Sequence, residues 1–512
     1  MKKPVKNERM NRYGLRSVLF MLLAALLIGS GPAAGEFPVD AQNVTSDCTV
    51  SLSGSAGEPK DLNTAKLLDG EYTTYVPLSG GDVLRITAAA EFTALYIIWN
   101  KVPGSWTLSA GNHSYTLGTH GYLHEFVDVK ALTGAAVKEA SVTIPKDLSV
   151  CDVYAFTEGS LPDWVQVWQP PCEKADLMLL STHSDDEQLF FAGVLPYYAG
   201  EIGAAVQVVY LTNHWDVQNR PHEQINGLWT VGVRNYPIVG PFPDDADTLN
   251  RTGESVDETL RRTLEIFGED ALVRYQVEMI RRFKPQVIVA HDANGEYQHG
   301  AHIANTYSLR KALEPAADPA QYAESAQQYG TWAVPKTYLH LWEENKIVMN
   351  WDEPLSKFGG KTAFEVSKSG YACHRSQQWT WFTKWLTGTA EGESDTIAKA
   401  SEITKYSPCE YGLYQTAVGS DTNADFLDHI TLYRDQVQDP PLEDPTPAPE
   451  GPTDVPGGSA SPAATGNGSA ADEGKDSDLG TILIYCVMAA CVLCILIMAA
   501  ASARSKKKGR SR

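Results

Sequence analysis

The chain has 512 residues, which at roughly 100–200 residues per domain predicts two or three domains. A hydrophobic fraction of 43% and an aromatic fraction of 10% are typical of globular cores and exclude general disorder. The formal net charge of −21 argues against a nucleic-acid-binding body, because phosphates would be repelled, so no nucleic-acid partner is expected.

Residues 1–35 have the layout of a secretory signal peptide. A basic start is followed by an unbroken apolar run from Val18 to Ile28 and then by small residues, with cleavage expected near Ala34 or Gly35. The alternative is an uncleaved N-terminal anchor.

Residues 36–170 are expected to form a β-sandwich. Short alternating apolar runs (VLRITA, ALYIIW and SVTIP) lie between clusters of Gly, Pro, Asn and Asp, which is typical of a sandwich or jelly roll. The LxDG-then-T pattern within Asn63 to Ser109 is similar to that of discoidin-type, galactose-binding-like sandwiches. Such a module binds carbohydrate or serves as a spacer, and the sequence leaves both open. A disulfide between Cys48 and Cys151 would join the two ends of this domain.

Residues 171–438 show a different pattern. The apolar strands LMLLST, VQVVYLT and PQVIVAH alternate with the amphipathic helical stretches VDETLRRTLEIF and ALVRYQVEMIRRF. Buried strands that alternate with such helices predict an α/β fold with a Rossmann-like parallel sheet covered on both faces. Because sites in open α/β sheets form at the carboxyl ends of the strands, we expect the functional site there.

The first polar motif, HSDDE, follows directly on the strand LMLLST. Its adjacent carboxylates repel one another, so the cluster requires a compensating cation or an exposed loop. His183 and Asp186 are three residues apart, and on a turn or helix start they face one point, as two metal ligands would. Asp185 between them points elsewhere and is available to accept a proton. The alternative is a solvated acidic turn that caps the next helix.

The second polar motif, GEYQHGAH, follows the strand PQVIVAH and precedes the helical stretch IANTYSLRKAL. His299 and His302 are three residues apart and share one helix face; the alternative is a pair of surface or helix-cap histidines. The two motifs supply His183, Asp186 and His302 for one metal. Two imidazoles and one carboxylate are a catalytic zinc set with a position open for water. Because the same set also serves non-haem Fe²⁺, the identity of the metal stays open.

The C-terminal residues predict a membrane anchor. Residues 439–478 are a Pro/Gly/Ser-rich linker. Residues 479–503 are free of charge over a length that spans a bilayer, for which ~20 residues suffice, and predict a transmembrane helix. The basic residues in 504–512 place this tail in the cytoplasm. We therefore expect a single-pass cell-membrane protein whose catalytic body is extracellular.

The pairing of HSDDE with GEYQHGAH resembles the PIG-L/LmbE-like family, which includes N-acetylglucosaminyl-phosphatidylinositol de-N-acetylases. That family carries (A)HPDDE after its first strand and a later GHxDH-type element. Here Ser184 replaces the usual Pro and Ala301 the usual Asp, and neither position is a ligand in the family pattern. The resemblance covers about residues 171–390 and includes weaker elements in the same order: LTNH at 211–214, Arg220-x-x-Glu223, Phe242-Pro243-Asp244 and His374-Arg375-Ser376-Gln377.

The resemblance implies a role for each matching residue. His183, Asp186 and His302 are similar to the family's zinc ligands, and Asp185 is similar to its general base. His299 is similar to the histidine that stabilises or protonates the reacting acetamide.

Arg220 and Asp244 are similar to residues that contact substrate, whereas His374 is expected to be structural. The resemblance implies a zinc-dependent N-deacetylase that removes acetate from an N-acetylglucosamine-type sugar in an extracellular glycan or glycolipid. Two alternatives remain: a non-catalytic surface carbohydrate-binding protein, and a metal-dependent hydrolase of another N-acyl substrate. The intact Asp185, together with all three ligands, favours an enzyme.

Overall fold

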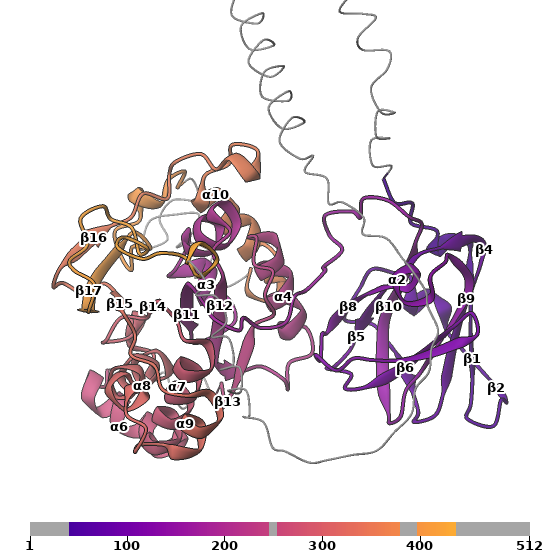
Figure 1. Cartoon of the computed structure of the whole chain (residues 1–512), viewed down its shortest axis with the longest axis horizontal. Helices are drawn as coiled ribbons and strands as arrows, with labels where there is room; N and C mark the ends of the chain where they lie inside the picture. The colour runs from indigo at the N-terminus through magenta and orange to yellow at the C-terminus, as the bar shows by residue number, and fades with distance from the viewer. Residues whose placement is uncertain (1–39, 245–252, 379–396, 437–512) are drawn as a thin grey trace, which may run out of the picture. The chain divides into compact units, whose positions relative to one another are not determined.

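The computed structural model describes residues 40–244, 253–378 and 397–436, which are coloured in Figure 1. They form an N-terminal, sheet-rich region that ends with the strand finishing at Phe156, and an α/β region whose first strand begins at Leu177. This is the predicted order of the two folds along the chain.

The N-terminal region consists of two antiparallel sheets, with strand orders β2-β1-β4-β9-β6-β7 and β3-β10-β5-β8. Leu84 and Ile86 of β4 share a core with Leu95 and Ile97 of β5, so the sheets pack face to face. The strands are β1 (Cys48–Ser53), β2 (Pro59–Lys60), β3 (Val76–Leu78), β4 (Val83–Phe92), β5 (Ala94–Trp99), β6 (Trp106–Ala110), β7 (His113–Leu117), β8 (His124–Asp128), β9 (Val137–Thr143) and β10 (Leu148–Phe156), with the short helix α2 (Val129–Thr133) after β8.

The cysteines of the described residues are free thiols: Cys48, Cys151, Cys172, Cys373 and Cys409. The disulfide between Cys48 and Cys151 that the sequence suggested is therefore not formed in this structure.

The α/β region is built on one sheet with the strand order β13-β12-β11-β14-β15-β17-β16. The first five strands in this order pair in parallel, and β17 pairs antiparallel with both β15 and β16. The parallel sheet predicted from the apolar runs is thus present, extended by an antiparallel edge. The strands are β11 (Leu177–Ser181), β12 (Val206–Asn213), β13 (Ile238–Pro243), β14 (Val287–Ala290), β15 (Lys336–His340), β16 (Lys346–Val348) and β17 (Glu410–Thr416).

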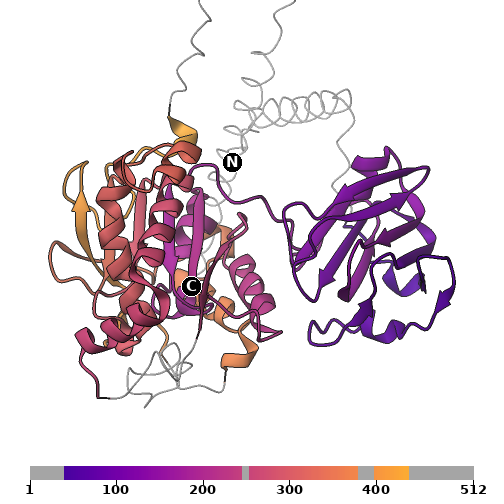
Figure 2. The ribbon, with the colours of Figure 1, turned by 90° about the horizontal axis from the view of Figure 1, so that it is seen from below.

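Helices cover both faces of this sheet. Leu177 and Leu179 of β11 pack in one core with residues of α3, α4 and α10, whereas Met178 and Leu180 pack in another with residues of α7 and α8. In Figure 1 the helices of residues 256–329 lie together below β11, β14 and β15, and Figure 2 shows the same helices seen from below. The helices are α3 (Asp186–Leu189), α4 (Arg220–Thr230), α6 (Val256–Phe267), α7 (Glu269–Phe283), α8 (Gly300–Ala317), α9 (Ala323–Tyr329) and α10 (Ala363–Tyr371).

The predicted localisation at the cell membrane is corrected by the structure. None of the helices within residues 40–244, 253–378 and 397–436 is both long enough and apolar enough to traverse a bilayer. The expectation came from the hydropathy of the sequence alone. The predicted signal peptide (1–35), linker (439–478), transmembrane segment (479–503) and basic tail (504–512) lie outside the described residues.

Truncation of a core side chain should destabilise the α/β region measurably. Leu179 is fully buried, so Leu179→Ala removes apolar contacts and leaves a cavity, which costs about 2–5 kcal/mol of unfolding free energy. We expect a lower thermal unfolding midpoint by differential scanning calorimetry. Val348→Ala, at a position that is 60% exposed, is the control and should leave the midpoint nearly unchanged. Equal midpoints for both variants would contradict the assigned core.

Candidate metal centre

Histidines gather at the carboxyl ends of the parallel strands. The strands β12, β11, β14 and β15 are neighbours in the sheet, and a buried histidine lies at or just after the end of each: His214, His183, His291 and His340, in that order. The carboxyl ends of parallel strands share one edge of the sheet, which is where such folds place their sites. The sequence analysis gave a role to His183 alone of these four. Each of the four lies at or just after the end of an apolar run in the sequence, and this shared position could have identified the other three as candidate site residues.

The first motif forms the turn between β11 and α3. Asp186 is the first residue of α3, and its Oδ2 accepts a hydrogen bond from the backbone N–H of His183 at 2.7 Å. The same oxygen lies 3.2 Å from His183 Nδ1. The predicted convergence of these two side chains is therefore present.

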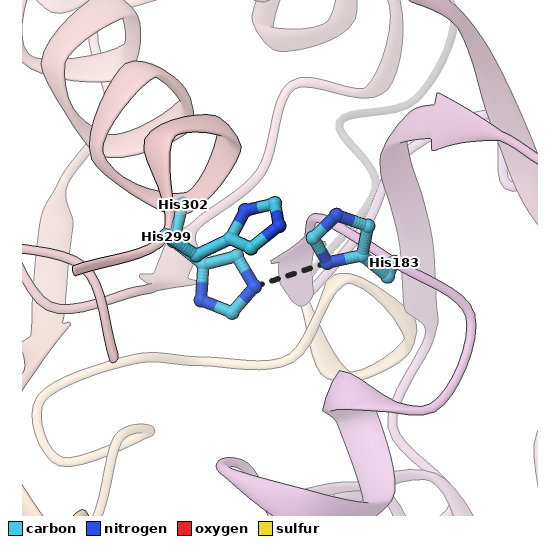
Figure 3. Close-up of side chains that lie close together, drawn as sticks. All are labelled: His183, His299 and His302. Carbon is cyan, nitrogen blue, oxygen red and sulfur yellow. Dashed lines mark hydrogen bonds between the residues drawn. The ribbon is translucent and has the colours of Figure 1, made fainter. Parts of the chain in front are cut away.

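The second motif brings a third side chain to the same point. His302 lies in the first turn of α8, and its Nε2 is 3.0 Å from His183 Nδ1 and 3.2 Å from Asp186 Oδ2. Figure 3 shows the His183 and His302 rings directed at each other, with the dashed line marking this contact. The three atoms form a nearly equilateral triangle. Ligands at 2.0–2.1 Å from a tetrahedral zinc ion would lie about 3.3 Å apart, so the triangle fits one such ion.

The hydrogen-bonding partners of the two imidazoles show which ring atoms hold lone pairs. His302 Nδ1 lies 2.7 Å from a carboxylate oxygen of Glu296, so Nδ1 carries the proton and Nε2 does not. His183 Nε2 faces Asp244 Oδ1 at 3.4 Å, and when Nε2 carries the ring proton the lone pair lies on Nδ1. In that tautomer two lone pairs and a carboxylate oxygen face one another, which is unfavourable unless a cation lies between them.

The pKa of His183 also indicates that positive charge is favoured at this point. Burial alone would lower the pKa of this imidazole, but Asp244 and Asp186 beside it raise its pKa to about 10. The negative charge that favours a proton on this ring also favours a metal cation in its place.

His291 lies near the triangle but is not one of its ligands. Its Nε2 is 3.6 Å from Asp186 Oδ2, and the two residues also lie close to His302. However, the backbone N–H of Thr182 donates to His291 Nε2 at 3.0 Å. Because this hydrogen bond occupies the lone pair, Nε2 is not available to a metal.

His299 lies beside the triangle as the N-cap residue of α8. Its Nδ1 accepts a hydrogen bond from the backbone N–H of Ala301 at 3.3 Å, which leaves the ring proton on Nε2. Its ring centroid is 4.6 Å from that of His183, and Figure 3 shows the rings adjacent. Burial, followed by the neighbouring His183 and His302, holds the pKa of His299 well below its usual value. The residue is therefore a neutral hydrogen-bond donor.

Asp185 adopts an unusual backbone conformation with φ of 146°, a region that is strained for a residue with a side chain. Its Oδ2 lies 3.4 Å from Arg220 Nη1, and its backbone N–H donates to Glu187 Oε2. Burial raises the pKa of Asp185 to about 6, although Arg220 acts in the opposite direction. Strain of this kind is typical of functional sites, where the surrounding structure holds it in place.

Arg220 and Asp244, the predicted substrate contacts, both touch residues of the centre. Arg220 Nη2 donates to Ser184 O at 2.8 Å. Asp244 Oδ2 lies 3.4 Å from His214 Nδ1, while its other oxygen faces His183. Burial would raise the pKa of Asp244, but the two histidines hold it well below its usual range.

A cavity of about 770 Å³ adjoins the centre. Ser184, His214 and Arg220 line it, and so does Trp215, whose side chain is 60% exposed. This cavity is large enough for a small ligand, for which pockets of roughly 300–1,000 Å³ are usual. His374 does not line it; its Nε2 lies fully buried, 3.4 Å from Glu187 Oε1.

Comparisons with known proteins confirm the resemblance that the motifs suggested. Residues 178–313 match the family model described as PIG-L, GlcNAc-PI de-N-acetylase. The chain is 31% identical over 184 residues to 1D-myo-inositol 2-acetamido-2-deoxy-alpha-D-glucopyranoside deacetylase 2 of Saccharopolyspora erythraea, a match that covers 31% of this chain and 63% of that protein.

Two further proteins show similarity to part of the chain. It is 47% identical over 185 residues to the mycothiol S-conjugate amidase of Streptomyces coelicolor, covering 32% of this chain and 60% of that protein. Both curated relatives are thus matched over less than two thirds of their length. Among solved structures, the N,N'-diacetylchitobiose deacetylase of Pyrococcus horikoshii aligns with a TM-score of 0.30 and 15% identity, covering 41% of this chain and 74% of that one.

Removal of one of the three ligand side chains should abolish metal binding. We expect the full chain to bind one divalent ion and His302→Ala to lose nearly all of it, because two ligands alone hold zinc poorly. Inductively coupled plasma mass spectrometry of purified protein gives the metal content. His113→Ala, at an exposed position on β7, is the control and should retain the ion. Full retention in His302→Ala would remove His302 from the ligand set.

Proposed function

Residues 178–313 form a domain of the PIG-L family, and from this premise we propose that the chain is a metal-dependent N-deacetylase. The observation that carries the proposal is the triangle of His183 Nδ1, Asp186 Oδ2 and His302 Nε2, with Asp185 next to it in the chain. We propose zinc as this ion, since two imidazoles and one carboxylate are a catalytic zinc set.

The residues around the triangle have the properties that amide hydrolysis needs. A divalent ion held there supplies Lewis acidity toward the amide carbonyl and toward water. Asp185, with its pKa near 6, accepts the proton of the attacking water as the general base. Arg220 keeps that carboxylate oriented through the contact between Nη1 and Oδ2 at 3.4 Å.

His299, whose ring lies beside that of His183, acts on the reacting carbonyl oxygen. Its Nε2–H donates a hydrogen bond to the oxyanion that develops as water attacks the amide carbon. The carbon–nitrogen bond then breaks, the nitrogen takes up a proton, and acetate and a free amine leave. Being neutral, His299 would add no positive charge to a centre that holds a metal cation when loaded.

The substrate we propose is an N-acetylglucosamine-type sugar within a glycan or glycolipid. The names of the relatives support this class, since one acts on a 2-acetamido-2-deoxy-glucopyranoside. The name of the other, a mycothiol S-conjugate amidase, supports a different amide substrate as the second candidate. The adjoining cavity, with the exposed Trp215 in its wall, suits a sugar ring that stacks on an indole.

The role of Asp185 is tested by Asp185→Asn. The amide has a similar size but does not accept a proton at neutral pH, so we expect acetate release to fall by about 10²–10⁴-fold. Metal content should stay at the wild-type level, because Asp185 is outside the ligand triangle. Asp216→Asn, at an exposed position in the loop after His214, is the matched control. Wild-type turnover by Asp185→Asn would show that the general base is a different group.

The substrate class is tested with the zinc-loaded full chain and a panel of N-acetyl compounds. The panel contains N-acetylglucosamine, its β-1,4 oligomers, N-acetylglucosaminyl-inositol and N-acetylcysteine, and acetate is measured enzymatically. We expect acetate from at least one of the sugars. Acetate from N-acetylcysteine alone would establish the second candidate. No acetate from any compound, with the metal shown to be bound, would favour a non-catalytic carbohydrate-binding protein.

A further inference from the structure

A buried carboxylate outside the metal triangle, that of Glu296, lies behind His302. Glu296 is fully buried and begins the short 3-10 turn Glu296–Gln298 that precedes α8. Its Oε2 lies 2.7 Å from both His291 Nδ1 and His302 Nδ1. Its Oε1 lies 2.6 Å from His340 Nδ1 and accepts from the backbone N–H of Asp292 at 3.1 Å. Each of these contacts joins the carboxylate to an imidazole ring or to a backbone N–H donor.

The positions of the protons follow from the second nitrogen of each ring. His291 Nε2 accepts from the backbone N–H of Thr182, so His291 Nδ1 carries a proton and donates to Glu296. His340 Nε2 lies 2.9 Å from Ser407 O, a carbonyl oxygen that only accepts, so this nitrogen donates. A further proton must then lie between His340 Nδ1 and Glu296 Oε1, because two lone pairs would not approach to 2.6 Å.

These contacts leave His302 a single arrangement. With Glu296 Oε2 accepting at Nδ1, the ring presents the lone pair of Nε2 to the triangle. Ala301, its neighbour in the chain, has no polar side chain that would compete for the ring. His340 is the last residue of β15 and Ser407 precedes β17, so the carboxylate is tied to the sheet as well as to α8.

We propose that Glu296, held by His291 and His340, is a positioning residue that fixes the tautomer and orientation of His302 for metal binding. The inference rests on the metal centre of the proposed function and adds a residue that does not touch the ion. Carboxylates that accept from the far nitrogen of a ligand histidine raise its basicity as a ligand, and their loss typically costs 10–100-fold in metal affinity.

The proposal is tested by the zinc affinity of the full chain carrying Glu296→Gln. A glutamine side chain has an NH₂ group in place of one carboxylate oxygen. This group faces either the ring N–H groups of His291 and His302 or the backbone N–H of Asp292, and the negative charge that strengthens His302 as a ligand is lost. We expect the dissociation constant for zinc, measured by competition with a chromogenic chelator, to rise about 10–100-fold. Glu223→Gln is the matched control, since Glu223 is also fully buried but bonds to Asn219 and Ser376, away from the ligands. Its affinity should equal that of the wild type.

A second readout separates positioning from a general loss of structure. The visible absorption bands of Co²⁺ report ligand geometry, and we expect Glu296→Gln to shift them at saturating Co²⁺ while its far-ultraviolet circular dichroism stays unchanged. Wild-type affinity and wild-type Co²⁺ bands in Glu296→Gln would overturn the proposal. If the wild-type chain bound no metal at all, the proposed function itself would fail, so the two failures are distinguishable.

One measurement does not depend on the folding of a variant. In the zinc-loaded wild-type chain with ¹⁵N-labelled histidine, NMR correlations through the ring should show His302, identified by its absence in His302→Ala, protonated at Nδ1. Protonation of His302 at Nε2 instead would overturn the proposal, whatever the behaviour of Glu296→Gln.

Discussion

The structure at this edge of the sheet depends on one constraint, the compensation of buried negative charge. Asp185, Asp186, Glu187 and Glu296 are all at least nine-tenths buried, and a carboxylate in such surroundings is costly unless it is paired. Arg220 compensates one of them, and imidazoles surround two others. A cation between His183, Asp186 and His302 would complete this compensation. The clustering of histidines at the strand ends is therefore explained by charge.

Much of the fold could be predicted because the sheet is buried on both faces. Its strands are apolar without interruption, and its helices are amphipathic, so the two kinds of element are distinct in the sequence. The helix α6 occupies the predicted stretch from Val256 to Phe267, where Ser255 caps the start and Gly268 follows the end. The convergence of the two motifs could be predicted for a similar reason. His183 and Asp186 are three residues apart, as are His299 and His302, and this spacing places both members of a pair on one side of a turn or helix.

The other contacts of the site could not be predicted from the spacing of residues along the chain. Glu296 meets His340 across 44 positions of the chain, and His214 meets Asp244 across the sheet, so their roles depend on how separate strands pack. The exclusion of His291 from the ligands depends on one backbone N–H, that of Thr182, whose direction no sequence pattern encodes. The contacts of the Asp244 carboxylate with the rings of His183 and His214 were likewise not predicted, and its contact with substrate stays a prediction.

The separation of the ligands along the chain has a consequence for biogenesis. His183 and His302 are 119 positions apart, and they meet only after β11, β14 and α8 have assembled into the parallel sheet. Pairings of this non-local kind form late and slowly in folding. The full ligand set therefore exists only in the assembled domain, in contrast to small metal-stabilised domains that fold around their ion. During synthesis, all three ligands are present only once α8 has left the ribosome, so an ion can contact all three only after that point.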